Sequence, residues 1–279
     1  MIIVRDARGL DAFHGGVFVP TMGALHAGHR ALIEHAATLA KAHKPALPVV
    51  VSLFVNPTQF NEKSDFDRYP RDEAADARMC EIAGADCVFA PAVEVMYPSE
   101  NPAPIPPLPA VATEPGLEDA HRPGHFAGVC QVCARLFTLV RPRSAIFGEK
   151  DWQQLAVIRA LAADSFPGLT IVGHPTVRED DGLAMSSRNA LLAPNHRRQA
   201  TALVKALLEA SKHQDISAAE TAGRRVLLAS RIKPEYFAIR DAATLSGPES
   251  GRPCRALVAA RVGSVRLIDN APWPGFAIP

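Results

Sequence analysis

The fold is decided by the stretch Pro20-Thr21-Met22-Gly23-Ala24-Leu25-His26-Ala27-Gly28-His29. A short apolar run, residues 17–19, precedes it, and apolar residues recur at helical spacing between residues 32 and 40 after it. We therefore expect a strand, a tight loop and a helix. In such a unit the free N–H groups of the helix's first turn point back toward the carboxyl end of the strand, where an anionic group can bind. Phosphate is the usual occupant.

His26 and His29 stand three residues apart within this stretch. On an opening helical turn that spacing puts both imidazoles on one side, and Gly28 leaves room between them for a flat base or a phosphate. The alternative is a loop that merely needs glycines, with solvated or capping histidines, because a four-residue pattern recurs by chance. The other motifs of the chain have to decide between the two.

The first half of the chain alternates strand-like and helix-like patterns. Residues 47–55 are nearly continuously apolar and rich in β-branched side chains, which is typical of a strand covered on both faces of a parallel sheet. Further strands are expected at 86–90, 145–147 and 169–172, with helices over about 71–83, around Cys130 and over 152–163. This order predicts a Rossmann-like, doubly wound parallel sheet whose ligand lies at a topological switch point.

A proline-rich stretch interrupts the alternation. Residues 98–109 hold six prolines, which excludes a helix or a central strand there. Because strands and helices resume afterwards, we interpret 98–126 as an excursion from one domain. Its end, His121 to Phe126, suits a flap that closes over a ligand, and a plain surface turn is the alternative.

The pattern changes from about residue 177 onward. A polar loop, 178–189, is followed by expected helices near 195–212 and 217–230, and then by strand-like segments at 236–239, 256–260 and 265–268. Helices followed by strands without alternation predict a small α+β domain. We therefore divide the chain into a domain of residues 1–176 and a smaller C-terminal domain of residues 177–279.

Composition narrows the function classes. Hydrophobic residues at 48% and charged residues at 21% are ordinary for a globular protein. Basic and acidic residues nearly cancel, 30 against 29, and no basic run appears, so we expect no nucleic acid partner. Because the sequence shows neither a signal peptide nor a long apolar stretch, we expect a cytoplasmic protein with no membrane partner.

The five cysteines are an odd number without a regular framework, which favours a reducing compartment. Cys130 and Cys133 could form a redox or metal pair, but no second pair completes a zinc site. They lie inside the helical apolar pattern of residues 129–140, which favours buried thiols. No metal-ligating residues are predicted.

A second phosphate-binding pattern lies near the start of the C-terminal domain. Met185-Ser186-Ser187-Arg188 offers two hydroxyls and a guanidinium within four residues, a combination that can hold the outer phosphates of a nucleotide. Alone it is a common surface-loop sequence. Together with the His-x-Gly-His pattern it matches the paired motifs of class I aminoacyl-tRNA synthetases and related nucleotidyltransferases.

Five motifs in order make the match closer. They are Pro20 to His29, Phe54-Val55-Asn56-Pro57-Thr58-Gln59-Phe60, Arg122-Pro123-Gly124-His125-Phe126, Phe147-Gly148-Glu149-Lys150-Asp151-Trp152-Gln153-Gln154-Leu155 and Asp181-Gly182-Leu183-Ala184-Met185-Ser186-Ser187-Arg188-Asn189. Together they closely resemble the pantothenate synthetase (pantoate–β-alanine ligase) family over essentially the whole chain. Residues 266–270 also look like that family's closing strand.

The resemblance implies a two-step reaction. Pantoate and ATP, with Mg²⁺, give pantoyl adenylate and pyrophosphate, and β-alanine then displaces AMP to give pantothenate. It implies that residues 1–176 bind ATP and pantoate, that residues 177–279 act as a lid, and that the protein is a homodimer.

The resemblance also assigns residues to roles. Its ATP contacts fall on Met22, Gly23, Ala24, Leu25, His26, Ala27, Gly28, His29, Gly148, Glu149, Lys150, Asp151, Val177, Met185, Ser186, Ser187 and Arg188. Its pantoate contacts fall on Gln59 and Gln154, for which two surface glutamines are the alternative. His29 takes the position of the catalytic proton donor, with His26 beside it. Because Ala184 replaces the first lysine of the superfamily's Lys-Met-Ser-Lys-Ser pattern, Lys150 and Arg188 are left as the cationic pair at the phosphates.

Three other functions compete with this one. A nucleotidyltransferase that retains the nucleotide in its product shares the His-x-Gly-His pattern. A tRNA synthetase would need an anticodon-binding module and a basic surface, neither of which is evident. A nucleotide-sensing protein on the same fold would have less chemical reason to keep all these polar positions together.

Overall fold

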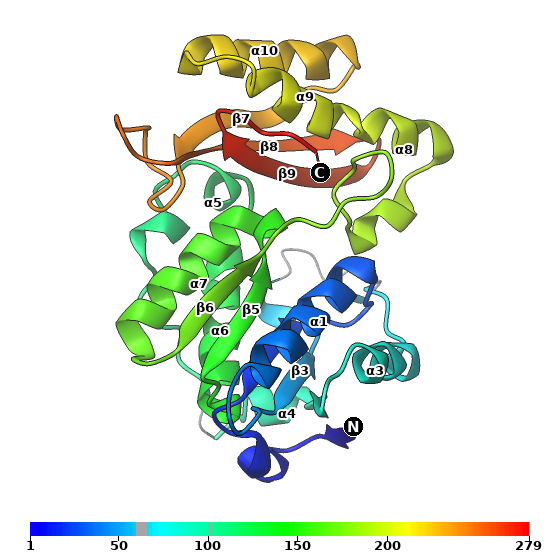
Figure 1. Ribbon diagram of the computed structural model, residues 1–279, viewed down its shortest axis with the longest axis vertical. Coiled ribbons are helices and arrows are strands. Elements are labelled where there is room, and N and C mark those ends of the chain that lie inside the picture. Colours follow the sequence, from blue (N-terminus) through cyan, green and yellow to red (C-terminus); the bar gives the residue numbers. More distant parts are fainter. Residues whose placement is uncertain (60–65, 68, 101, 279) are drawn as a thin grey trace. The chain divides into compact units, whose positions relative to one another are not determined.

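The computed structural model describes residues 1–59, 66–67, 69–100 and 102–278 (Figure 1). The chain forms two compact units. The first comprises Met1–Glu149 and Gln154–Pro175, and the second comprises Lys150–Gln153 and Thr176–Pro279. No sequence pattern marks the four-residue segment Lys150–Gln153 as part of the second unit.

The first unit is built on a six-stranded sheet in the order β1-β4-β3-β2-β5-β6 with every pair parallel. The strands are β1 (Ile2–Val4), β2 (Val17–Thr21), β3 (Val49–Leu53), β4 (Cys87–Phe89), β5 (Ser144–Gly148) and β6 (Thr170–His174). The expected doubly wound parallel sheet is confirmed. The edge strand β1 was not predicted, because three residues are too few to show a period.

The topological switch point lies between β2 and β5. From β2 the chain moves outward through β3 to β4, and it then returns to the other side of β2 for β5 and β6. In sheets of this kind ligands bind outside the carboxyl ends of the strands where the order reverses. The loops after β2 and β5 are therefore the ones that the fold places at a binding crevice.

Helices cover both faces of this sheet. On one face, α1 (Ala27–Lys41) and α3 (Glu73–Ile82) bury apolar side chains against Val17 and Val19 of β2 and their neighbours. On the other face lies α6 (His125–Val140), where the Phe137 ring meets Phe147 edge to face at a centroid distance of 6.5 Å. Each fully buried side chain of this size contributes about 1.5–3 kcal/mol. The remaining elements are η1 (Arg8–Phe13), η2 (Pro57–Gln59), α4 (Val93–Met96), η3 (Ala110–Ala112), α5 (Glu118–His121), η4 (Glu149–Asp151) and α7 (Trp152–Ser165).

The proline-rich stretch has no helix or strand among its described residues before η3 begins at Ala110. It is tied to α6, because the Gln131 side-chain amide donates to the Ala103 carbonyl at 2.7 Å. Its movement as a flap stays a prediction.

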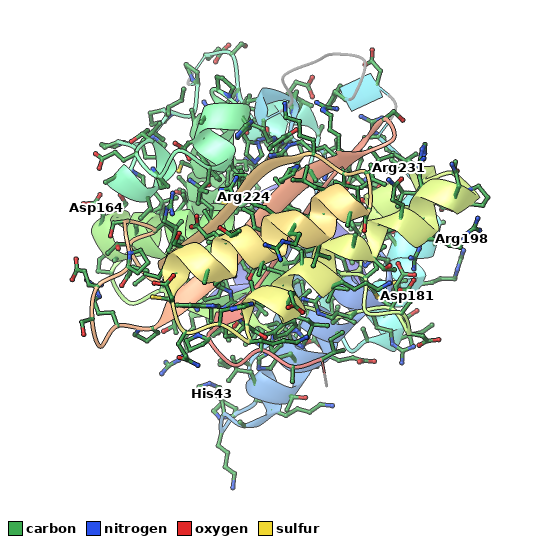
Figure 2. The ribbon with its side chains drawn as sticks, turned by 90° about the horizontal axis from the view of Figure 1, so that it is seen from above. His43, Asp164, Asp181, Arg198, Arg224 and Arg231 are labelled. Atoms are coloured by element: carbon green, nitrogen blue, oxygen red, sulfur yellow. The ribbon has the colours of Figure 1, made fainter. Side chains whose placement is uncertain are left out.

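The second unit holds a three-stranded antiparallel sheet of β7 (Pro234–Asp241), β8 (Cys254–Val262) and β9 (Val265–Trp273). Helices α9 (Ala202–Ala210) and α10 (Ile216–Ala229) lie side by side over one face of it (Figures 1 and 2). Helix α10 packs closely on β7, since a Cβ on Gly223 of α10 would lie 2.3 Å from the Phe237 ring of β7. Arg224, labelled in Figure 2, donates to the Phe237 carbonyl at 2.6 Å. This small α+β unit agrees with the predicted fold class.

One helix prediction was wrong. The expected helix over 195–212 is two helices, α8 (Pro194–Ala200) and α9, with Thr201 as the residue between them. The Thr201 hydroxyl donates to the Arg198 carbonyl at 2.9 Å, which offers the backbone a local alternative to a continuous helix. None of the helices in the described residues is long and apolar enough to cross a lipid bilayer.

Candidate active site

The loop after β2 is held by one buried carboxylate. Asp76 of α3, only 5% exposed, accepts hydrogen bonds from the backbone N–H groups of Ala24 at 2.9 Å and Leu25 at 2.8 Å. The loop is a tight one, with Gly23 at φ +80° and Ala24 at φ +52°. Glycine is required at 23, because a Cβ there would lie 2.9 Å from an Asp76 oxygen. Asp76 therefore fixes the path of the chain into α1.

The two histidines of the motif lie against each other at the start of α1. Their ring centroids are 4.1 Å apart, as the three-residue spacing predicts. The Nδ1 atom of His26 accepts from the Gly28 N–H at 3.1 Å, and the Nδ1 atom of His29 accepts from the His26 N–H at 3.3 Å. An Nδ1 atom that accepts carries no hydrogen, so the neutral rings hold theirs on Nε2.

These caps use one of the N–H groups at the helix N-terminus, where the sequence predicts an anion site. The Gly28 N–H is bonded to the His26 ring, so it is not available to an anion. The Nε2–H groups of the two rings are further donors that the motif could offer to a phosphate oxygen. The capping alternative considered for the sequence is thus seen in the structure, and donation to a phosphate stays a prediction.

The Gln59 side chain lies beside the loop after β2. Its amide nitrogen is 3.2 Å from the Met22 sulfur, and its amide oxygen accepts from Asn56 at 3.1 Å. The backbone there packs tightly on α6, since a Cβ on Gly128 would lie 2.5 Å from the Thr58 carbonyl oxygen. Two loops that are distant in sequence are thereby brought together at the carboxyl edge of β2 and β3. Phe60, the last residue of this motif, lies outside the described residues.

Asn56 organises the polar contacts around Gln59. It is 1% exposed, its amide donates to the Gly128 carbonyl at 3.1 Å, and its oxygen accepts from the Tyr97 hydroxyl at 2.8 Å. Burial raises the pKa of Tyr97 to about 12, so this phenol remains a donor at neutral pH. A ring nitrogen of His125 lies 3.2 Å from the Gln59 carbonyl oxygen. Gln59 is thus oriented by buried partners.

Gly148 ends β5 and Glu149 begins the loop after it; both belong to the first unit and are partly buried. A Cβ on Gly173 of β6 would lie 3.1 Å from a Glu149 carboxylate oxygen, so that side chain lies against β6. Gln154, on the first turn of α7, is partly exposed.

In the second unit Val177 and Met185 are neighbours. The Met185 N–H donates to the Val177 carbonyl at 2.9 Å, and a β-bridge pairs Arg178 with Ala184 inside the loop that they close. Ser186 caps η5 (Ser187–Leu191) by accepting from the Arg188 N–H at 3.3 Å. The Arg188 side chain is exposed. The four-residue motif is therefore held by backbone groups and the Ser186 hydroxyl, which leaves the arginine side chain at the surface.

Lys150 also belongs to the second unit. Its ammonium lies 3.7 Å from an Asp151 carboxylate oxygen with the side chain 17% exposed, and its carbonyl accepts from the Asn270 amide at 2.8 Å. The second unit thus holds both cationic residues of the predicted pair.

Comparison with known proteins gives the family. Residues 5–272 match the family model described as pantoate-beta-alanine ligase. The chain belongs to this family. It is 48% identical over 283 residues to a pantothenate synthetase of Rubrobacter xylanophilus, covering 97% of this chain and 94% of that one. The resemblance of the sequence to this family of ligases is confirmed.

Solved structures agree. A crystal structure of pantothenate synthetase from Thermus thermophilus matches with a TM-score of 0.88 at 42% identity, covering 98% of this chain and 100% of that one. A pantoate-beta-alanine ligase from Francisella tularensis, complexed with beta-gamma ATP and beta-alanine, matches with a TM-score of 0.79 at 32% identity, covering 98% and 97%. This chain is an enzyme of the pantoate-beta-alanine ligase family.

Two residues of the site in this family member were not identified from the sequence. Asp76 could have been noticed, because it lies on the same buried stripe of α3 as Ala77 and Cys80, where a carboxylate needs a reason. Asn270 carried no such signal, since its contact with Lys150 spans 120 residues of sequence.

The donor groups of the chain bear on whether it could hold Mg²⁺ by itself. Among the described residues no group of three or more His, Cys, Asp or Glu side chains could hold a metal ion. Mg²⁺ commonly binds through substrate phosphates and water rather than a protein cage. A Mg²⁺ ion bound through the nucleotide would not need such a group.

Proposed function

We propose that the chain condenses pantoate with β-alanine in two steps at the expense of ATP. In the first, a pantoate carboxylate oxygen attacks the α-phosphorus and pyrophosphate leaves. In the second, the β-alanine ammonium loses a proton to solvent, its nitrogen attacks the acyl carbon of the pantoyl adenylate, and AMP leaves as the new amide releases its extra proton. Membership of the ligase family and the relative complexed with beta-gamma ATP and beta-alanine support this reaction.

The observation that carries the proposal is the pair of imidazoles, His26 and His29, that cap the start of α1 at the switch point. Both Nδ1 atoms are occupied by backbone N–H groups, so both Nε2–H groups are donors without any protonation of the rings. Pantoate's carboxylate is ionised near neutral pH, and the first step needs no strong base. It needs donors where one anion attacks another, and each preorganised donor is worth roughly 2–4 kcal/mol of barrier.

The remaining roles follow the chemistry of each side chain. Lys150 and Arg188 neutralise charge on the phosphates, and His29 is the residue that donates to the departing pyrophosphate. The ATP contacts run over Met22–His29 and Gly148–Glu149 in the first unit and over Lys150–Asp151, Val177 and Met185–Arg188 in the second. Mg²⁺ bound to the nucleotide would add positive charge at the phosphates.

Gln59 and Gln154 are proposed to recognise pantoate. An amide can donate to a carboxylate and accept from a hydroxyl without adding charge. Gln59 suits this role because Asn56 and Met22 already fix the direction of its amide. Its recognition of pantoate is therefore preorganised.

The organisation of the protein is part of the proposal. We propose domains of residues 1–176 and 177–279, a flap within 98–126 and closure of the C-terminal domain, which would exclude water from a reactive anhydride. A homodimer is proposed from the sequence resemblance, and a cytoplasmic location from the use of cysteine. Five free cysteines suit a reducing compartment.

The test is exchange of labelled pyrophosphate into ATP with Mg²⁺ and without β-alanine. Exchange that requires pantoate is expected, and amide formation should follow on adding β-alanine. Exchange that is absent although ATP binds would favour a nucleotide-sensing protein or another acid substrate.

A further inference from the structure

We propose that Asn270 and Arg255, on the sheet of the second unit, are positioning residues that fix Lys150 for its role at the nucleotide phosphates. The inference rests on the proposed function for the role of Lys150, and on the contacts of the second unit for the positioning. It explains why four residues from the middle of a strand-loop-helix unit belong to the C-terminal unit.

Asn270 uses both ends of its amide. Its nitrogen donates to the Lys150 carbonyl at 2.8 Å, and its oxygen accepts from Nε of Arg255. The orientation of the amide is unambiguous, because arginine only donates and a carbonyl only accepts. Asn270 is 3% exposed, so neither contact competes freely with water. An aspartate could keep the contact with Arg255 but could not donate to Lys150.

Arg255 is held in turn by the sheet and by Trp152. Leu257 pairs with Asn270 across β8 and β9, so Arg255, two residues before Leu257, lies diagonally from Asn270 on the same face. The Arg255 guanidinium carbon lies 3.5 Å from the centroid of the Trp152 ring, which is a stacked cation–π contact. Two residues of the segment Lys150–Gln153 are thus held by one connected pair of side chains.

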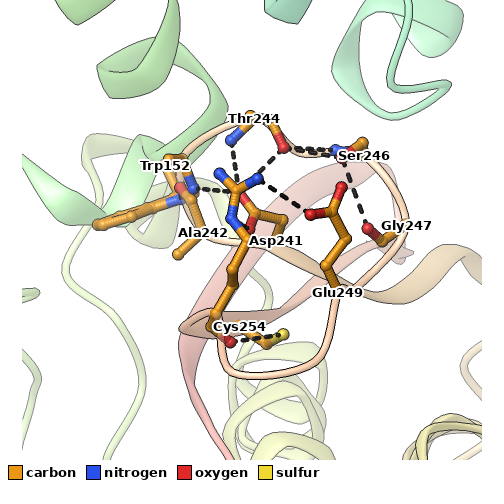
Figure 3. A network of polar contacts seen from close by, with 10 residues as sticks. Trp152, Asp241, Ala242, Thr244, Ser246, Gly247, Glu249 and Cys254 are labelled. Carbon is orange, nitrogen blue, oxygen red and sulfur yellow. Dashed lines mark hydrogen bonds and ion pairs between the residues drawn. The ribbon is translucent and has the colours of Figure 1, made fainter.

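Trp152 has a second anchor in the loop after β7. Its indole N–H donates to the Ala242 carbonyl at 2.9 Å (Figure 3). That loop is fixed by Asp241, which accepts from the Thr244 N–H at 2.8 Å and pairs with Arg252 at 2.8 Å. The segment is therefore bound to two separate parts of the sheet, which restricts both its position and its rotation.

The strand β9 is also in contact with η5, the short helix that contains Arg188. The Lys150 backbone and the helix that carries Arg188 therefore both contact one strand of one compact unit. A change at Asn270 should disturb the position of Lys150 on this strand without touching His26, His29 or Gln59. This predicts a loss of turnover in adenylate formation with pantoate binding preserved.

The experiment compares wild type, Asn270→Asp, Arg255→Lys and the control Arg266→Lys. Arg266 is a suitable control because it lies on β9, the strand of Asn270, but makes a different contact. Its Nε donates to Glu235 of β7 at 2.7 Å. For Asn270→Asp, kcat of pantoate-dependent pyrophosphate exchange should fall on the order of 10- to 100-fold, with KM for pantoate changed little. The kcat of Arg255→Lys should also fall, and the kcat of Arg266→Lys should stay near that of wild type.

A double variant separates positioning from general damage. In a Lys150→Ala background, adding Asn270→Asp should lower exchange by no more than about 2-fold, because the residue that Asn270 positions is already gone. A full further loss would show that Asn270 acts elsewhere and would overturn the proposal.

Amide hydrogen exchange of residues 149–155 tests the anchor without any activity. Exchange in this segment should be at least about 10-fold faster in Asn270→Asp than in wild type, at unchanged global unfolding. Equal protection overturns the anchor even if wild type catalyses pyrophosphate exchange. Wild-type protein that lacks pantoate-dependent exchange counts against the proposed function instead, and the protection of the segment still decides the anchor.

Discussion

The carboxylate of Asp76 accepts the backbone N–H of Leu25 at 2.8 Å, across 51 residues of sequence. The same carboxylate also accepts from the Ala24 N–H, so Asp76 of α3 fixes the loop that leads to both histidines. The position of the imidazoles thus depends on a residue that touches neither of them in these contacts.

Asp76→Asn should therefore weaken both stability and activity. An amide presents one acceptor oxygen in place of two, so one backbone N–H loses its partner or faces an N–H₂ group. We expect the free energy of unfolding to fall by about 1–3 kcal/mol and pyrophosphate exchange to fall at least about 10-fold. Denaturant unfolding and exchange kinetics measure the two effects.

Asp72 provides the matched control. It caps the same helix by accepting from the Ala75 N–H at 2.9 Å, and it is exposed. Asp72→Ala should cost about 1 kcal/mol of stability and leave exchange unchanged. Equal loss of activity in both variants would mean that α3 matters only through its stability.

Gly128→Ala should act on Gln59. The added Cβ would lie 2.5 Å from the Thr58 carbonyl oxygen and 2.8 Å from the Gln59 nitrogen, so the backbone of that loop must move. We expect a loss of about 1–3 kcal/mol in stability and a rise in KM for pantoate that exceeds the rise in KM for ATP. Gly247→Ala, where a Cβ meets nothing within 4 Å, should change neither. A rise that is larger for ATP would contradict the role of Gln59.

Much of this architecture was predictable from the sequence because its signals are local. The apolar continuity of the run 47–55 predicted a buried parallel strand, which the structure has at 49–53, and the spacing of His26 and His29 predicted adjacent rings. The contacts that orient the site were not predictable, since Asp76 meets Leu25, and Asn270 meets Lys150, only after the chain has folded. The break at Thr201 was missed for another reason: it accompanies a local side-chain hydrogen bond, which the residue pattern does not show.

His26 offers a way to separate capping from donation. The oxygen of an asparagine can accept from the Gly28 N–H as Nδ1 does, but asparagine has no group at the place of Nε2. His26→Asn should keep the helix cap and the stability, and it should lower pyrophosphate exchange by about 100-fold.

His26→Gln should lose about 1 kcal/mol of stability while it retains more activity than His26→Asn. His43→Ala, in the loop after α1, is the control for a histidine outside the site. The reverse order of activities in the two His26 variants would show that capping is the only role.

We expect the buried thiols of α6 to make the protein less stable in alkaline solution. Burial raises the pKa of Cys130 from 9.0 to about 11, and the thiol is 0% exposed. Burial also raises the pKa of Cys133, beside it on α6. Because each thiol ionises more readily in the unfolded chain, its contribution to the stability of the fold is fully present below about pH 9 and is lost as the pH rises toward the folded-state pKa.

Between these two pH values each such thiol should lower the free energy of unfolding by about 1.4 kcal/mol per pH unit. Denaturant unfolding from pH 8 to about pH 11 measures this slope. The slope should be smaller in Cys130→Ala by the share of one thiol, and an unchanged slope, or rapid reaction of Cys130 with a thiol reagent in the folded protein, would favour the redox-pair alternative over buried thiols.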